Sequence, residues 1–257
     1  MAEVIVIVEA RADAEIATKL AERVLVEAID WLEADQVEYL LQWRGLEQNT
    51  AYSCWKDISD ITQRCQASGL RIPRTRGHSS SGPLRADGPT TRKILNLIRV
   101  LQKTQPEIKA LLLIRDLDNQ PDRRHSLEQA RQEEPQRLPS LQIILGTADP
   151  KREAWVLNGF LAETKSEKQI LAELKDKLGF DPCQEAHRLR STASQADRTR
   201  DSKAVLDRLT QKNYPRERQC WEETDLDHLK ALGQETGLRG YLLEIEQFLS
   251  KIPDLNP

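Results

Sequence analysis

Residues 4–8 read Val-Ile-Val-Ile-Val, and Glu9 follows them directly. An unbroken run of β-branched residues is typical of a strand buried on both faces, as in a parallel sheet covered by helices. From residue 14 to residue 28 apolar side chains recur at helical spacing, and Asp13 stands where it can cap this helix. The chain is therefore expected to open with a strand, an acidic turn and a helix.

A second apolar run, Ala-Leu-Leu-Leu-Ile at residues 110–114, also ends in acids, because Asp116 and Asp118 follow it closely. Further strands are predicted at 37–43 and 141–145, with helices between the strands. Strands that alternate with helices indicate an α/β fold whose mostly parallel sheet is flanked by helices.

The last third of the chain has a different pattern. After Lys151 no strand pattern remains, and helical spacing predicts helices at 153–161, 166–178, 201–212, 226–232 and 238–249, with polar segments near 185–200 and 213–224. We therefore expect an α/β domain over residues 1–150 and a C-terminal helical extension over residues 151–257 that packs on it.

The acids that end the two apolar strands form a candidate site. Ligands gather at the carboxyl ends of parallel strands, and Glu9, Asp116 and Asp118 are all expected there. If the backbone stays extended, the carboxylates of Asp116 and Asp118 point the same way, and Glu9 faces them if the two strands are neighbours. Three carboxylates suit Mg²⁺ or Mn²⁺. The alternative is that these acids only form turns or cap helices.

The order of these motifs, VIVIVEARAD and then LLLIRDLD, resembles the toprim domain of topoisomerases, primases, recombination proteins and nucleases of the overcoming-lysogenization-defect type. Glu9 matches the first motif, Asp116 and Asp118 match the second, and Asp13 falls where many members also carry an acid. The resemblance implies a toprim-like sheet, a metal site and phosphodiester chemistry, with Glu9 as a ligand or as the general base. Ala10 stands where glycine is usual, so the turn after Glu9 is expected to differ.

Residues 149–157, DPKREAWVL, are similar to the Glu-Ala-Trp element of small standalone toprim proteins from prokaryotic defence loci. On that resemblance Glu153 is a fourth candidate acid and supplies a second metal position. The alternative is a first-turn acid that is favoured by the helix dipole. The resemblance implies a nuclease in phage or plasmid defence, with an ATPase or another defence protein as a possible partner.

A basic segment precedes the second apolar strand. Residues 71–89 are predicted to form a long loop rich in proline, glycine and serine, and residues 71–103 carry eight basic side chains against Asp87 alone, a local charge of +7. Such a segment suits a phosphate backbone, with DNA favoured over RNA, or it is simply a solvated surface. The candidate nucleic-acid-binding residues are Arg74, Arg76, Arg85, Arg92, Lys93 and Arg115. A second basic stretch, residues 188–200, either extends this nucleic-acid-binding surface or binds a partner.

The composition narrows the remaining classes of function. The 257 residues carry a net charge of −3, which does not favour a general polyanion binder. The apolar runs are too short to cross a bilayer, so no membrane partner is expected. The four cysteines form no CxxC pair, and a cytoplasmic location is expected.

Two classes of function stay open. The first is a Mg²⁺- or Mn²⁺-dependent nuclease, and the second is a non-catalytic toprim-like subunit that binds nucleic acid or a partner in a larger complex. A receiver-like signalling domain fits poorly with the paired acids and the basic loop. The sequence has no Walker-type glycine loop, so any ATP hydrolysis needs a partner protein.

Overall fold

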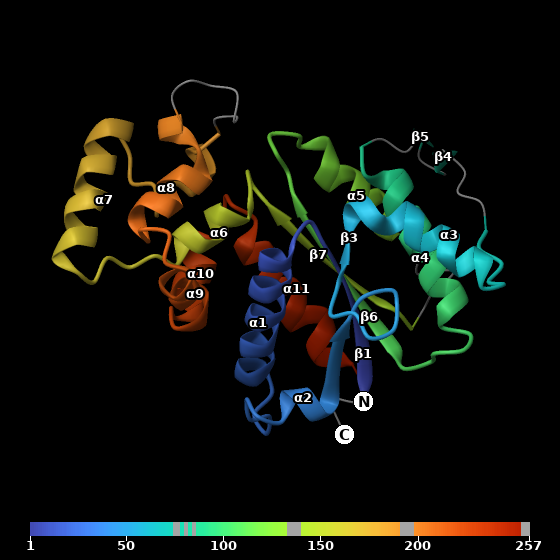
Figure 1. Ribbon diagram of the computed structural model, residues 1–257. Coiled ribbons are helices and arrows are strands. Elements are labelled where there is room, and N and C mark those ends of the chain that lie inside the picture. The colour runs from blue at the N-terminus through green and yellow to red at the C-terminus, as the bar shows by residue number, and fades with distance from the viewer. Residues whose placement is uncertain (74–77, 80–81, 84–85, 133–139, 191–197, 253–257) are drawn as a thin grey trace.

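A computed structural model describes residues 1–73, 78–79, 82–83, 86–132, 140–190 and 198–252 (Figure 1). The central strand β1 (Ala2–Val8) pairs in parallel with β6 (Ile108–Asp116), which pairs in parallel with β7 (Gln142–Ala148). On its other side β1 pairs in parallel with β2 (Leu41–Arg44) and β3 (Ser53–Cys54). The expected α/β class with a parallel sheet is confirmed, and the two apolar runs are neighbours.

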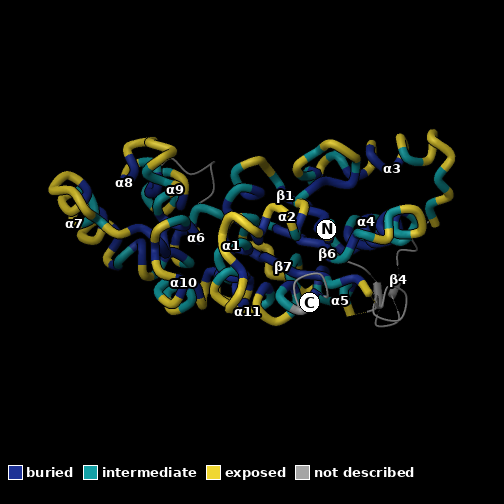
Figure 2. Tube along the Cα trace, turned by 90° about the horizontal axis from the view of Figure 1, so that it is seen from below, coloured by how far each residue is buried: buried dark blue, intermediate teal, exposed yellow. Residues whose placement is uncertain are grey.

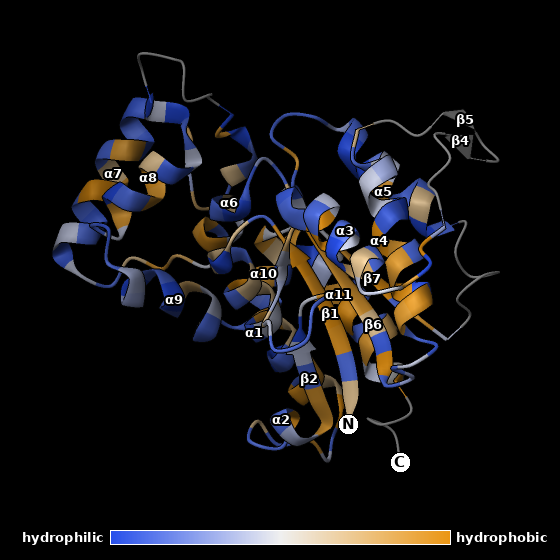
Figure 3. Ribbon diagram, turned by 45° about the vertical axis from the view of Figure 1, so that its right-hand side comes forward, coloured by the Kyte–Doolittle hydropathy of each residue, from blue (hydrophilic) through white to orange (hydrophobic). Residues whose placement is uncertain are grey.

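The two faces of the sheet are covered by different helices. Helices α1 (Arg11–Ala28) and α11 (Leu238–Phe248) lie on one face, and α3 (Ile58–Ala67), α4 (Gly88–Leu101) and α5 (Asp122–Gln132) lie on the other (Figure 1). Within β1, Val4, Val6 and Val8 face the first layer, while Ile5 and Ile7 face the second. The strands are therefore buried from both sides, as Figures 2 and 3 show, which explains their unbroken apolar sequence.

The strand predicted at 37–43 is wrong in its first half. Residues 37–40 form a short helix, α2 (Val37–Leu40), whose turn is closed by the Leu41 N–H donating to the Val37 carbonyl, and only β2 is a strand. Val37 and Leu41 are buried while Tyr39 is exposed, so the apolar spacing fits a helical turn as well as a strand.

The C-terminal region is helical, as expected. It consists of α6 (Arg152–Asn158), α7 (Lys165–Leu178), α8 (Ser202–Leu209), α9 (Tyr214–Glu222), α10 (Leu226–Leu232) and α11. Helix α9 falls in a segment that was expected to be polar and irregular. The Asn213 side chain caps it by accepting the Arg216 N–H, and Cys220 and Trp221 provide its buried face.

The remaining short elements lie in loops. A two-stranded antiparallel pair, β4 (His78–Ser79) with β5 (Gly82–Pro83), lies within the expected basic loop. Among the described residues, no helix is long and apolar enough to cross a membrane.

A close contact fastens the C-terminal helices to the sheet. Trp155 of α6 stacks on Tyr241 of α11, with 5.2 Å between ring centroids, and both rings are buried. Gly146 of β7 lies beneath them: a Cβ there would come within 3.0 Å of both rings and 2.5 Å of Ile114 Cδ1. The absence of a side chain at Gly146 therefore lets the two aromatic rings reach the sheet.

Gly146→Ala is expected to lower the free energy of unfolding by about 1–3 kcal/mol, because the added methyl overpacks this contact. Urea denaturation measures the change. The matched control is Gly240→Ala on α11, where a Cβ meets no atom within 4 Å. The control should leave stability unchanged or raise it by up to about 1 kcal/mol. Equal stability of the two variants would contradict the packing role of Gly146.

Candidate active site

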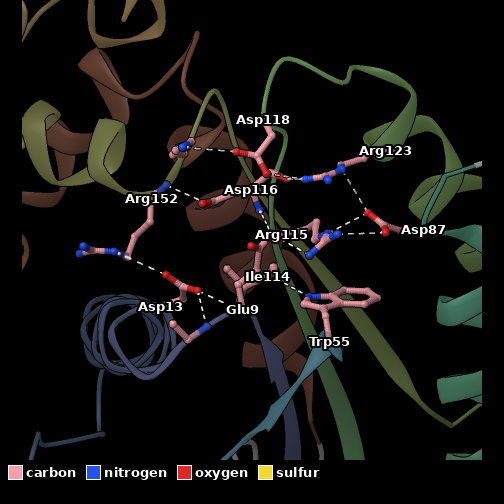
Figure 4. A network of polar contacts seen from close by, with 12 residues as sticks. Glu9, Asp13, Trp55, Asp87, Ile114, Arg115, Asp116, Asp118, Arg123 and Arg152 are labelled. Carbon is pink, nitrogen blue, oxygen red and sulfur yellow. Dashed lines mark hydrogen bonds and ion pairs between the residues drawn. The ribbon is translucent and has the colours of Figure 1, made fainter. Parts of the chain in front are cut away.

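The pairing of β1 with β6 brings the predicted acids to one edge of the sheet. The register sets Ile7 opposite Leu113, so Glu9 comes level with Arg115, one residue before Asp116. The Asp116 N–H donates to Glu9 Oε1 at 3.3 Å (Figure 4). Glu9 and Asp116 therefore lie side by side, as the sequence pattern predicts for neighbouring strands.

The turn after Glu9 is held by Asp13. The Asp13 Oδ2 atom accepts the backbone N–H groups of Glu9 at 3.1 Å and of Ala10 at 2.8 Å. Helix α1 begins at Arg11, so Asp13 lies inside its first turn and is not the N-cap residue that the sequence suggested. Ala10 has an extended backbone, with φ −148° and ψ 171°, which alanine adopts without strain. Alanine at position 10 therefore imposes no backbone strain at this turn.

Asp118 departs from the expected geometry. Strand β6 ends at Asp116, Leu117 is buried, and Asp118 has a left-handed backbone with φ 48°. The extended backbone that would align Asp116 with Asp118 is therefore absent. Asp118 instead accepts a hydrogen bond from Arg123 Nη1 at 2.8 Å, and Lys151 Nζ lies 3.7 Å away. Asp118 lies at the rim of the site.

The start of helix α6 closes the other side of the site. The Arg152 N–H donates to Asp116 Oδ1 at 2.9 Å, and the Arg152 guanidinium pairs with Asp13 at 3.5 Å and with Glu217 of α9 at 2.6 Å. Glu153, in the first turn of α6, lies 3.5 Å from the same guanidinium. Arg152 therefore links acids from three separate parts of the chain.

Arg115 occupies the opposite flank. Its Nη1 donates to Glu9 Oε1 at 2.7 Å, its Nε and Nη2 donate to the two oxygens of Asp87, and its guanidinium stacks on Trp55 at 5.3 Å (Figure 4). Asp87 also lies 3.6 Å from Arg123 Nε. The single acid of the basic segment thus anchors two arginines beside Glu9 and Asp118.

The carboxylates act on one another electrostatically. Burial, together with the nearby charges of Glu9, Asp13 and Glu153, raises the pKa of Asp116 to about 8. Burial also raises the pKa of Glu9, against the opposing effect of Arg115, and it raises the pKa of Asp13. Four carboxylates, from the turn after β1 and from α1, β6 and α6, thus share one partly buried region, where bringing like charges together costs free energy.

This donor set matches a hard divalent cation in chemistry but is not arranged around one. Within the ranges that the structure describes, no group of three or more His, Cys, Asp or Glu side chains is positioned to hold a metal ion. The reason is that other groups already bind the carboxylates: Arg115 binds Glu9, the Arg152 N–H binds Asp116, and Arg123 binds Asp118. A cation that binds Glu9 through Oε1 would therefore have to displace Arg115 from that atom.

The expected nucleic-acid-binding residues have varied locations. Arg115 lies in the site, and Lys93 Nζ donates to Ser59 Oγ at 3.1 Å on the far layer of helices. Arg92 is buried, with 6% of its surface exposed. A side chain that binds phosphate was expected to lie on the surface. Arg74, Arg76 and Arg85 lie outside the described residues.

Several residues of the site were not predicted from the sequence, namely Trp55, Arg123, Lys151, Arg152 and Glu217. Arg152 and Lys151 precede the predicted Glu153, and Arg123 comes five residues after Asp118, so their positions near the motifs were available clues. Glu217 and Trp55 come from distant segments, and no local pattern marks them.

Comparison with known proteins assigns no family. The chain matches no family model, no curated protein and no solved structure. The toprim resemblance therefore stays a prediction.

The raised pKa of Asp116 predicts how stability depends on pH in the absence of divalent cations. Between about pH 4 and about pH 8 the folded protein holds a proton on Asp116 that the unfolded chain has lost, so the free energy of unfolding falls as pH rises. The full slope for one such proton is about 1.4 kcal/mol per pH unit. Asp116→Asn is expected to flatten this slope in urea denaturation with a chelator present.

The control for this prediction is Asp176→Asn, which changes an exposed carboxylate on α7. It should keep the pH dependence of the wild type. A slope in Asp116→Asn as steep as that of the wild type would show that the pKa of Asp116 is not raised in the folded protein.

Proposed function

We propose that this chain is a Mg²⁺- or Mn²⁺-dependent nuclease of toprim type, which hydrolyses phosphodiester bonds in nucleic acid. The observation that supports it best is the grouping of Glu9, Asp13 and Glu153 around Asp116, whose pKa is raised to about 8 by its burial and then by these neighbouring charges. A fold does not gather four carboxylates without cost, and such grouping is typical of sites that bind cations.

In this proposal Glu9 and Asp116 are the central metal ligands, and Asp13 and Glu153 serve a second position. Asp118, on the rim, adds negative charge that acts on Glu9. A bound divalent cation supplies positive charge that neutralises a phosphodiester and lowers the pKa of an attacking water.

The chain's own side chains provide the remaining chemistry. Arg115 and Arg123, now held by Asp87, Glu9 and Asp118, have planar guanidinium groups that suit the oxygens of a substrate phosphate. In the alternative in which Glu9 is the general base and not a metal ligand, its Oε1 accepts a proton from the attacking water once Arg115 turns to a phosphate. Its pKa, raised by burial, makes Glu9 a better base than an ordinary carboxylate.

A second candidate is a non-catalytic subunit that binds nucleic acid or a partner. The observation that favours it is the pairing of the carboxylates with N–H and guanidinium donors, together with the lack of a preformed metal-binding group among the described residues. In that case the arginines neutralise the acids permanently, and the site recognises a ligand without cutting it.

The toprim resemblance extends the proposal beyond the site. It favours DNA over RNA as the substrate, a role in phage or plasmid defence in the cytoplasm, and an ATPase or another defence protein as partner.

Cleavage assays test the nuclease proposal directly. Plasmid, linear duplex DNA, single-stranded DNA and RNA are incubated with the wild type in Mg²⁺ or Mn²⁺, and with Asp116→Ala/Asp118→Ala. We expect metal-dependent cleavage that falls more than about 100-fold in the variant, because the group that stabilises charge in the transition state is lost. Asp176→Ala/Asp227→Ala, which removes the same charge from exposed positions, should cleave like the wild type.

The pattern of results distinguishes the two candidates. Calorimetric Mn²⁺ binding without cleavage of any substrate would reject the nuclease and favour the binding subunit. If the wild type neither cleaves any substrate nor binds Mn²⁺, the acids serve only to stabilise the fold.

A further inference from the structure

A segment of the C-terminal region is fastened beside the acidic edge. Arg190 Nη1 donates to Asn119 Oδ1 at 3.1 Å and pairs with Asp149 Oδ1 at 2.9 Å, and Asn119 Nδ2 donates to the Arg190 carbonyl at 3.2 Å. Asn119 follows Asp118, and Asp149 follows β7. The chain around Arg190 is therefore attached to both turns that carry the candidate site.

Next to this attachment, two more arginines share one aromatic ring. The guanidinium carbons of Arg188 and Arg200 lie 4.1 Å and 5.8 Å from the ring centroid of Phe180, which is buried. An isolated antiparallel bridge between Arg190 and Asp201 holds the two parts of the chain together. Stacking on a ring occupies the flat face of each guanidinium and leaves its N–H edge available to an anion.

Two of these three arginines have an acidic partner, because Arg188 pairs with Glu185 and Arg190 pairs with Asp149. Glu185 pairs with Arg188 at 2.8 Å, but both side chains are 42% exposed, where such a pair contributes little. Asp201 uses a carboxylate oxygen to cap α8, accepting the Ala204 N–H at 2.8 Å. Throughout the described part of the chain no acid is paired with Arg200. Holding Arg188 and Arg200 over one ring thus creates a site that an anion would stabilise.

We propose that Arg188 and Arg200 form a track, anchored beside the site by Arg190, that binds the phosphate backbone of double-stranded nucleic acid and leads it to the carboxylates of Glu9 and Asp116. Two residues span at most about 7 Å, so Arg188 lies within that distance of Arg190. Arg190 in turn contacts Asn119 and Asp149, in the two turns that flank the site. The cleavage of the bound duplex rests on the proposed function, whereas the binding itself does not.

The surroundings favour a phosphate backbone over other partners. Among the described residues, the exposed large hydrophobic side chains are Met1, Trp31, Tyr39, Leu161, Tyr214 and Leu243, and none of them lies between residues 180 and 200. The buried centre of a protein–protein interface is enriched in apolar and aromatic side chains, and single-stranded nucleic acid is usually held by exposed aromatic rings. A surface of arginines without such groups suits the backbone of a duplex, bound independently of sequence.

The test is the affinity of the full chain for a fluorescein-labelled duplex DNA, measured by fluorescence anisotropy with Ca²⁺ at several salt concentrations. Arg188→Ala/Arg200→Ala is expected to weaken binding about tenfold or more and to lower the slope of log affinity against log salt by about 2, one for each lost phosphate contact. Arg200→Ala alone, a change at an exposed residue, should lower the slope by about 1.

The matched control is Arg208→Ala/Arg218→Ala, which removes the same charge from exposed arginines of α8 and α9. The control should bind like the wild type. Affinity and salt slope equal to the wild type in both Arg200→Ala and the double variant would overturn the track, as would a wild type that does not bind duplex DNA. Circular dichroism identifies any variant that fails to fold, and Arg188→Lys/Arg200→Lys, which keeps the charge, should recover most of the binding.

The outcomes separate this proposal from the nuclease. If the wild type cleaves duplex DNA and the arginine variants bind it as well as the wild type does, the nuclease proposal is supported and the track is rejected. A wild type that binds without cleaving, and loses binding in the arginine variants, keeps the track and rejects the nuclease.

Discussion

The parallel pairing of β1 with β6 is the constraint on which the candidate site depends. Both strands are buried on both faces, so each side chain is committed to one of two helical layers. A shift of the register by one residue would exchange those faces along the whole strand. It would also carry Glu9 away from Arg115 and from the Asp116 N–H. The packing of the core therefore sets the geometry of the acidic edge.

Arginines make this acidic edge compatible with a folded chain. Arg115 lies on one flank, where it pairs with Asp87 and stacks on Trp55. Arg152 lies on the other flank, where it pairs with Asp13 and Glu217. The raised pKa of Asp116 removes a further negative charge over part of the pH range. Arginine and proton together offset a repulsion that a divalent cation would otherwise relieve. The same arginines have the geometry to receive the phosphate that would accompany such a cation.

The C-terminal helices take part in the site as well as in the core. Helix α6 carries Arg152 and Glu153, α9 carries Glu217, and the Trp155–Tyr241 stack over Gly146 holds α6 and α11 against the sheet. Arg190 ties the following segment to the turns after β6 and β7. Side chains from residue 9 to residue 217 thus meet at one edge, although the apolar strands that define this edge come from the first 150 residues.

The sequence by itself determined the buried strands, most helices and the placement of Glu9 and Asp116 at strand ends, because apolar periodicity is a local property that burial imposes on each element. Its prediction of a strand at 37–40 is wrong, because Val37 and Leu41 fit a helical turn and a strand alike. Only the tertiary structure decided that Asp118 leaves the extended conformation, and that Asp87, Arg152 and Glu217 become partners of the acids. Glu217 lies 65 residues from Arg152 and Asp87 lies 28 residues from Arg115, so these pairings depend on how the helices cross the sheet. No local pattern encodes such a crossing.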